Sequence, residues 1–480
     1  MIDRGAALVR GYLNSVRRVA VGLLVLTALE ITVLVFLRVL APHSALELAV
    51  QIALGVTFAA LAAVELRAAL AVAVLELIVG GGSGRWTELP AGVTGRMLLD
   101  ATIAAVALVL LVKHARGGAG RRVLGQYGAN AALVAIVVPA VWIPLGVLNG
   151  YPVGSAIADG DGFLFFGFAL LLAAAALYGH LAWLRRWILV CCAINAVFLA
   201  TLFALAASRI VPGFQLRDLL LNTFDFGGQV TFLQNGLFRL HLASGLFLQV
   251  GVALVCWELI RSPRRWWPWL LMAVLLAALA GTYARGYWLG AFIAAAIVLV
   301  FGRQSAGFAA RHKRTLVVVL TLVVAIATLG LSVTSVGGGA GSSYVKVYQA
   351  WILLGQFLER PFVGWGFGAV AANYPYSDHF SYEITYLDRA FKLGIVGLAL
   401  FLSLPLRLLH DSVRVFRGRL PVPPKMPARE AIVPLAIIVS VLVITATNPY
   451  MAGSVGIGAV ILCIAWLDPF GRTTDATNPT

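Results

Sequence analysis

The feature that most constrains this chain of 480 residues is the recurrence of long apolar stretches from one end to the other. Runs of about 18 or more apolar residues are long enough to cross the roughly 30 Å hydrocarbon core of a bilayer as helices. Hydrophobic residues make up 61% of the sequence and charged residues only 12%, which is not the composition of a soluble globular chain. We therefore expect an all-α polytopic integral membrane protein.

The apolar stretches predict about 12–14 transmembrane helices. The candidate spans are residues 18–41, 45–63, 66–80, 96–113, 128–147, 161–181, 187–207, 237–259, 267–282, 284–302, 315–333, 391–409, 431–446 and 451–468. The third candidate is the shortest of them. If it does not cross the membrane, the alternation of the loops breaks unless a second span is also misassigned.

The net charge of +16 is explained by membrane topology. In membrane proteins Lys and Arg collect in the short cytoplasmic loops. When the connections are numbered alternately, most basic residues fall on one side, including Arg185, Arg264 and Arg414. This pattern predicts cytoplasmic termini and an outward-facing loop before residue 391. Because the charge follows the loops, no nucleic-acid partner is expected.

These observations divide the chain into four parts. The parts are residues 1–236, N-terminal transmembrane helices with an outer surface segment; 237–334, further transmembrane helices; 335–390, a large extracytoplasmic loop; and 391–480, C-terminal transmembrane helices with a cytoplasmic tail. The four cysteines and seven histidines show no metal-ligand spacing, so neither a metal nor another cofactor is predicted.

Arg285 is the most informative outward-facing cation. It follows one predicted span and opens the next, in a turn between Gly281 and Gly290. An arginine on the outer side runs against the positive-inside trend, and helix N-terminal N–H groups there favour anions. The alternative is an interfacial arginine among the aromatic residues Tyr283, Tyr287 and Trp288.

Three more arginines flank the outer segment 208–236, which we expect to lie along the membrane surface. They are Arg209, Arg217 and Arg239, and together they could hold a diphosphate. The alternative for each is a solvated side chain or a pair with a nearby aspartate, such as Asp218 or Asp225.

In the long loop, residues 351–358 are predicted to form a helix, and Pro361 with the glycines after it predicts a turn-rich stretch. Aromatic and glycine residues there suit either sugar contact or a packed interfacial loop. Glu383 stands at an apolar boundary, where desolvation would raise its proton affinity and suit it as a general base. The alternative is a solvated loop carboxylate.

The order of these motifs carries a resemblance to a known family. Ala-Arg-Gly-Tyr-Trp-Leu-Gly, then Glu-Arg-Pro-Phe-Val-Gly-Trp-Gly-Phe-Gly, then Glu-Ile-Thr-Tyr-Leu before Lys-Leu-Gly-Ile-Val-Gly resembles the C-terminal region of bacterial O-antigen ligases and polysaccharide polymerases. The resemblance covers about residues 237–408. It implies a GT-C-like membrane glycosyltransferase.

The family's essential arginine maps to Arg285, although Ala284 replaces the serine that usually precedes it. Ligases of the family typically carry His-Asn where this chain has Glu383 and Ile384, and the glutamate favours a polymerase, while His379 keeps a ligase possible. Lys346 stands near the family's basic loop position. Tyr348, Tyr382 and Tyr386 complete the candidate substrate-binding residues.

The resemblance implies inverting, metal-independent transfer of a glycan from undecaprenyl diphosphate to an acceptor glycan, with Glu383 as base and Arg285 binding the diphosphate. A ligase would use lipid A core as acceptor, and a flippase would only move the lipid-linked oligosaccharide. The implied location is the bacterial inner (cytoplasmic) membrane with the site facing the periplasm or cell exterior. The implied partners are membrane lipid and a chain-length regulator.

Overall fold

The computed structural model is a helical bundle, with a few segments placed outside it. It describes residues 2–40, 44–81, 105–106, 108–109, 112, 126–177, 179–223, 228–232, 238–302, 340–372, 382–420, 426–446 and 448–467. Among these residues, nine helices are long and apolar enough to cross a membrane. The predicted polytopic membrane protein is therefore confirmed as a class. The predicted spans 96–113 and 315–333 lie largely or wholly outside the described residues.

In chain order, the described elements are mostly helices. The helices and strands are α1 (Ile2–Leu40), α2 (Ala45–Val64), α3 (Leu66–Val79), α5 (Gln126–Leu148), α6 (Val153–Gly160), η4 (Asp161–Gly167), α7 (Phe168–Leu177), α8 (Leu181–Ala207), α9 (Gly213–Arg217), η5 (Asp218–Thr223), β1 (Gly228–Phe232), β2 (Phe238–Leu242), η6 (Ala243–Gly245), α10 (Leu246–Arg261), α11 (Trp267–Thr282), α12 (Arg285–Gly302), α15 (Ala340–Glu359), α16 (Thr385–Phe416), η7 (Ala428–Ala431), α17 (Ile432–Thr445), η8 (Tyr450–Ala452), α18 (Ser454–Leu462) and η9 (Cys463–Trp466).

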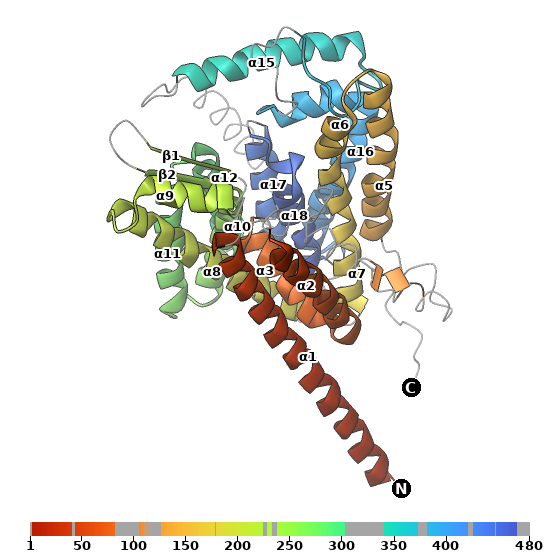
Figure 1. The fold of residues 1–480 in the computed structure, drawn as a ribbon, viewed down its shortest axis with the longest axis vertical. Coiled ribbons are helices and arrows are strands. Elements are labelled where there is room, and N and C mark those ends of the chain that lie inside the picture. Colours follow the sequence, from red (N-terminus) through yellow and green to blue (C-terminus); the bar gives the residue numbers. More distant parts are fainter. Residues whose placement is uncertain are drawn as a thin grey trace.

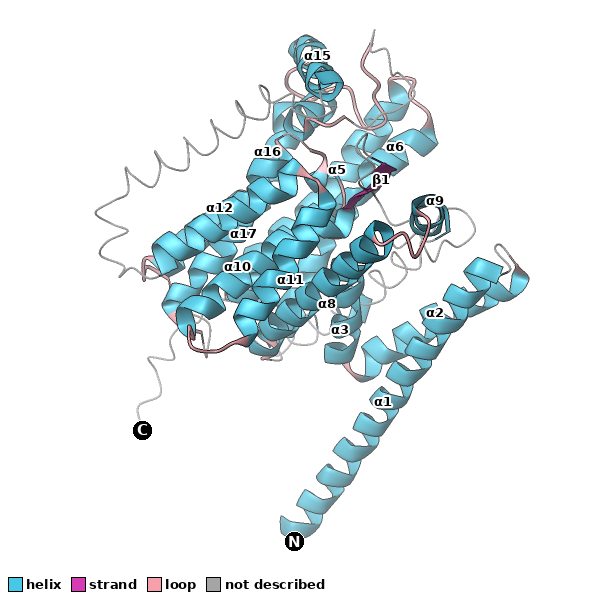
Figure 2. Cartoon of the chain, turned by 90° about the vertical axis from the view of Figure 1, so that its left-hand side faces the viewer, coloured by secondary structure: helices cyan, strands magenta, loops and turns pink. Residues whose placement is uncertain are grey.

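Helices α8, α10, α11, α12 and α17 run side by side through the body of the protein (Figure 2). Helices α10 and α17 are buried along most of their length and form the centre of the core. Helix α1 packs mainly on α2, and its N-terminal part extends away from the body (Figure 1). Burying apolar side chains among neighbouring helices fixes the bundle, while their outer apolar faces suit lipid.

The third predicted span corresponds to the short helix α3, which is separated from α2 by a break at Glu65. Glu65 between them has φ −146° and ψ 89°, so the chain leaves the helical conformation for one residue. Helix α3 has 14 residues, too few for a full bilayer crossing. Its inward side chains Leu70, Val74 and Leu77 are fully buried. The helix therefore belongs to the core.

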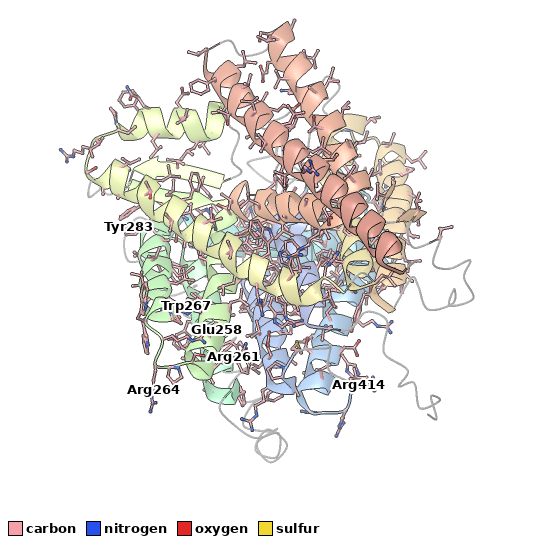
Figure 3. All side chains as sticks on the ribbon, turned by 90° about the horizontal axis from the view of Figure 1, so that it is seen from below. Glu258, Arg261, Arg264, Trp267, Tyr283 and Arg414 are labelled. Atoms are coloured by element: carbon pink, nitrogen blue, oxygen red, sulfur yellow. The ribbon has the colours of Figure 1, made fainter. Side chains whose placement is uncertain are left out.

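Three of the basic residues assigned to one side of the membrane lie at one end of the described bundle (Figure 3). Figure 3 shows Arg261, Arg264 and Arg414 along the same edge, with Tyr283 towards the other end of α11. The opposite end carries the first residues of α10, α12 and α16, together with α15, which crosses over the bundle (Figure 1). The charge pattern and the structure therefore divide these connections in the same way.

An antiparallel hairpin of β1 and β2 was not predicted by the sequence. It occupies part of the outer segment 208–236 and the first residues of the predicted span 237–259, which begins as a strand. The strand side chains Leu240 and Leu242 are 1% exposed, so an apolar face packs on the bundle. The alternation in Phe-Arg-Leu-His-Leu is typical of such a half-buried strand, but the adjoining apolar run conceals it.

Candidate functional site

Arg285 occupies the first position of α12, directly after a tight turn from α11. Tyr283 takes the left-handed conformation with φ 46°, which reverses the chain within two residues. The indole N–H of Trp288 donates to the Leu279 carbonyl at 2.6 Å and ties the two helices together. The Arg285 side chain is exposed at this end. A cation in a first helical turn is opposed by the helix dipole, so its position there favours a role towards an anion.

Strand β2 directs Arg239 and His241 to one face, because they are two residues apart. The His241 ring lies 5.0 Å from the Tyr287 ring, and its Nε2 is 3.1 Å from the Tyr450 hydroxyl. Tyr287 and Tyr450 stack at 5.2 Å between ring centroids. The Tyr287 hydroxyl donates to the Leu242 carbonyl at 2.7 Å. Strand β2, α12 and η8 thus meet around these rings.

Burial, with a smaller contribution from the positive charges of Arg239 and Lys346, lowers the pKa of His241 to about 4. The imidazole is therefore neutral at pH 7. Burial also raises the pKa of Tyr450, on which the charges of Arg239 and Glu383 act in opposite directions. The charges that act on these rings come from β2, α15 and the segment just before α16.

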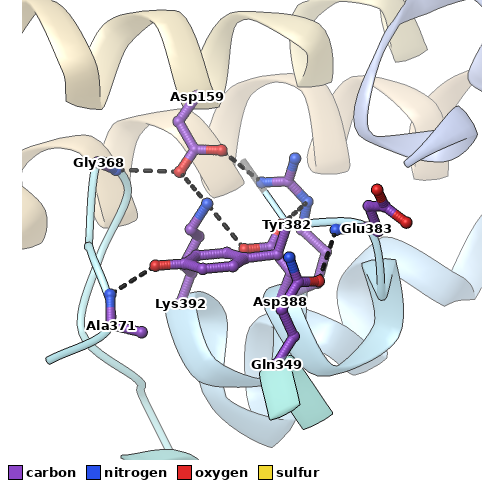
Figure 4. Close-up of polar contacts among 9 residues, drawn as sticks. Asp159, Gln349, Gly368, Ala371, Tyr382, Glu383, Asp388 and Lys392 are labelled. Atoms are coloured by element: carbon purple, nitrogen blue, oxygen red, sulfur yellow. Dashed lines mark hydrogen bonds and ion pairs between the residues drawn. The ribbon is translucent and has the colours of Figure 1, made fainter. Parts of the chain in front are cut away.

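Glu383 forms an ion pair with Lys346 on α15. The Lys346 Nζ lies 3.0 Å from a Glu383 carboxylate oxygen, and their side chains are 27% and 45% exposed. The Glu383 backbone N–H donates to the Gln349 side-chain oxygen at 3.2 Å. The expectation of a desolvated Glu383 is therefore wrong, because the side chain is partly exposed to solvent and its carboxylate contacts a cation. Figure 4 shows its side chain directed away from the interior contacts.

Asn448 lies close to residues that follow Arg285 and Glu383 in the sequence. A Cβ on Gly286 would lie 3.0 Å from the Asn448 amide nitrogen and 3.4 Å from the Tyr450 hydroxyl. On the other side, the Thr385 hydroxyl donates to the Asn448 carbonyl at 2.9 Å. Asn448 therefore lies between the start of α12 and the start of α16 and is close to both. We call the whole group the outer cluster: Arg239, His241, Arg285, Lys346, Glu383 and Tyr450.

The other predicted site residues have different placements. Arg209 and Arg217 are exposed before and within α9, and no ion pair or hydrogen bond among the described residues links them to the outer cluster. Tyr348 is 36% exposed on α15. His379 lies outside the described residues. From the predicted set, the structure pairs Lys346 with Glu383. It places Arg239 on the strand and Arg285 in the first turn of the helix that meet at the His241, Tyr287 and Tyr450 rings.

Tyr382 and Tyr386 have packing roles. Tyr382 is 1% exposed, and its hydroxyl accepts the Ala371 backbone N–H. The Tyr386 hydroxyl donates to the Leu442 carbonyl at 2.6 Å. Both phenols already use their hydroxyl groups within the protein. Their placement favours stabilising the start of α16 over the sugar contact that the sequence suggested.

The loop after α15 is packed between α5 and α16. The Phe367 N–H donates to the Trp142 carbonyl at 2.9 Å, and the Gly366 N–H donates to the Lys392 carbonyl at 2.9 Å. Gly366 has φ 89°, and a Cβ there would lie against the backbone of Gly146. Of the two readings of this glycine-rich stretch, the contacts favour a packed loop. The helix predicted over residues 351–358 is confirmed as part of α15.

Behind the outer cluster lies a buried group of four charges that sequence reasoning missed. Lys392 Nζ is 2.7 Å from Asp159 and 2.8 Å from Asp388, and Arg389 is 3.0 Å from Asp159. All four side chains are at most 3% exposed. The Gly368 N–H also donates to Asp159 at 3.0 Å (Figure 4). Two cations balance two carboxylates, which joins α6, the loop and α16 without a net buried charge.

Within the described ranges, no three His, Cys, Asp or Glu side chains lie together as a metal site requires. Comparison with protein-family profiles finds no match, and comparison with curated proteins finds no similar sequence. The protein is therefore defined as a helical, multi-pass membrane protein with a charged cluster at one end of its bundle.

Proposed function

We propose that the protein is a membrane glycosyltransferase that uses an undecaprenyl-diphosphate-linked glycan as donor and extends a polysaccharide. The observation that carries the proposal is the outer cluster. Within it, Arg239, Arg285 and Lys346 come from three separate elements, and Glu383 is the one carboxylate. A surplus of fixed cations beside a single carboxylate suits an enzyme that binds a diphosphate and deprotonates a hydroxyl.

Each group has a role in the proposed transfer. The cations neutralise the charge that grows on the leaving diphosphate, which lowers the energy of the transition state. Glu383 takes the proton from the acceptor hydroxyl as that oxygen attacks the anomeric carbon on the face opposite the diphosphate. An arriving diphosphate competes with Glu383 for Lys346, since the pair is partly exposed. The donor's arrival would thereby release the carboxylate for its role as base.

The proposal includes a GT-C-like architecture and a bacterial inner-membrane location, with the outer cluster facing the periplasm or cell exterior. Arg264 lies just before α11 and Arg285 just after it, so the two arginines lie at opposite ends of that helix, which supports this orientation. The resemblance of the motifs to O-antigen polymerases and ligases, with Glu383 in place of the ligase His-Asn pair, supports a polymerase over a ligase.

The test is a reconstitution of the purified protein with an undecaprenyl-diphosphate-linked oligosaccharide, in detergent and with a metal chelator present. A ladder of products on a gel is the expected result. One new band that forms only with lipid A core would replace the polymerase with a ligase. No product with either acceptor, combined with movement of the lipid-linked oligosaccharide across vesicles, would replace both with a flippase.

A further inference from the structure

The proposed transfer gives no role to His241, the histidine of the outer cluster. His241 lies on β2, two residues after Arg239 and on the same strand face. Its Nε2 is engaged with the Tyr450 hydroxyl at 3.1 Å. Its Nδ1 is buried, as is the Nε of Arg239, and neither atom has a hydrogen-bond partner among the described residues. Buried polar groups without partners are rare and mark places where a further ligand can be bound.

The charged and titratable groups around His241 come from every element that meets there. They are Arg239 on β2, Lys346 on α15, Tyr287 on α12 and Tyr450 on η8, with Glu383 acting on Tyr450. The two cations act directly on the imidazole, whereas the carboxylate is held by Lys346 at 3.0 Å. The ring is therefore surrounded by positive charge and neutral phenols. Burial first, and then these two cations, lower the pKa of the ring and keep it neutral until an anion arrives.

We propose that His241 binds the diphosphate of the donor as an imidazolium, taking up a proton as the anion binds. The inference rests on the proposed function for the identity of this ligand. A diphosphate beside Arg239 and Lys346 cancels the repulsion that disfavours a charged ring, and it adds an attraction of its own. The Nδ1–H then provides a charge-assisted hydrogen bond to a phosphate oxygen, while Nε2 remains on Tyr450.

If proton uptake by His241 is coupled to anion binding, the affinity for the anion depends on pH. The pKa of His241 without ligand is lowered to about 4 by burial and the two cations. If the anion raises that pKa above the working pH, binding takes up about one proton and becomes up to about tenfold tighter for each unit of falling pH. Pyrophosphate also titrates in this range. The contribution of His241 is therefore the difference in proton uptake between the protein and a variant without the imidazole.

The experiment titrates inorganic pyrophosphate into the full-length protein in detergent, by calorimetry at pH 6.5 in two buffers of different ionisation enthalpy. The protein is compared with His241→Gln and, should that variant not fold, His241→Asn. The matched control is His180→Gln, which removes another histidine whose pKa is lowered by burial and by Arg67. We expect the protein and the His180 variant to take up about one proton more than the His241 variant.

Equal proton uptake in the protein and in the His241 variants would overturn the inference and leave the proposed function standing. A protein that makes a product ladder but does not bind pyrophosphate would likewise overturn the inference and leave the proposed function standing. Extra proton uptake in a protein that transfers no glycan would support the anion site and remove the transferase. In nitrogen-15-histidine spectra of the unmodified protein, one ring should become charged on adding pyrophosphate, and no charged ring would again overturn the inference.

Discussion

Lys346 on α15 and Glu383, two residues before the start of α16, form an ion pair of 3.0 Å at the end of the bundle that α15 crosses. The pair holds the Glu383 carboxylate in place at the position that the proposed transfer needs for its base. It also connects the helix over the bundle to the helix that carries the buried charges. The geometry of the proposed site therefore depends on residues from two parts of the predicted outer loop.

The first prediction concerns the proposed base. Glu383→Gln should lower glycan transfer by about 10²–10⁴-fold, because the amide cannot accept the hydroxyl proton. Binding of the lipid donor should persist, since the cations remain. Glu359→Gln, which alters an exposed carboxylate at the end of α15, is the matched control and should transfer normally. Full activity in the Glu383 variant would remove this residue as the base.

The second prediction concerns the first residue of α12. Arg285→Ala should abolish transfer at normal expression, because a cation in the proposed diphosphate site is lost. Arg264→Ala, at the opposite end of the bundle, should retain activity (Figure 3). The measurement is the product ladder, together with the amount of each protein in the membrane. A fully active Arg285 variant would contradict the diphosphate role.

The third prediction is a pH dependence of stability without ligand. The pKa of His241 is lowered to about 4 from an ordinary value of 6.5. Between these values the unfolded chain binds a proton that the folded protein does not, so the free energy of unfolding rises with pH through this window. We expect the thermal midpoint in detergent to rise from pH 4.5 to 6.5 more steeply than in His241→Gln. Identical slopes would show that another group is responsible.

Sequence patterns predicted the features that depend on local order. The break between two apolar runs locates the turn before Arg285, which falls at Tyr283 and Ala284 between α11 and α12, and the helix predicted over residues 351–358 lies within α15. Arg285 was recognisable because a cation on the side predicted to be outer opposes the positive-inside trend. These signals lie within a few neighbouring residues, where a pattern is sufficient.

The features that were missed depend on tertiary contacts. Asp159 meets Lys392 and Arg389 across more than two hundred residues, and no spacing in the sequence links them. The pairing of Lys346 with Glu383 likewise depends on how α15 crosses the bundle. The hairpin strand β2 continues into the apolar run of α10, so hydropathy assigned it to a helix. Each error arises where packing overrides the local pattern.

The fourth prediction concerns the kink in α16. Gly394 has φ 63°, and a Cβ there would lie against the backbone of Phe362 and Val363. Gly394→Ala should lower the free energy of unfolding by more than about 1 kcal/mol, because the new side chain meets a backbone that cannot move aside. Gly355→Ala in α15 is the control, since nothing lies within 4 Å of a Cβ there. That variant should be neutral or slightly stabilised in thermal unfolding.

The last prediction separates the buried charges from the chemistry. Lys392→Met removes the cation that touches both Asp159 and Asp388, at 2.7 Å and 2.8 Å. It leaves two carboxylates facing Arg389 alone, so we expect a loss of about 3–5 kcal/mol in the free energy of unfolding. Combining Lys392→Met with Asp388→Asn restores neutrality and should recover part of that loss.

Thermal unfolding in detergent measures this recovery directly. A double variant that is no more stable than Lys392→Met would show that Lys392 stabilises the fold through packing rather than through charge. The outcome bears on the outer cluster, because the same four charges hold the start of α16, where Glu383 and Thr385 are anchored (Figure 4). If charge balance fixes that end of the helix, the double variant should also regain transfer in proportion to its regained stability.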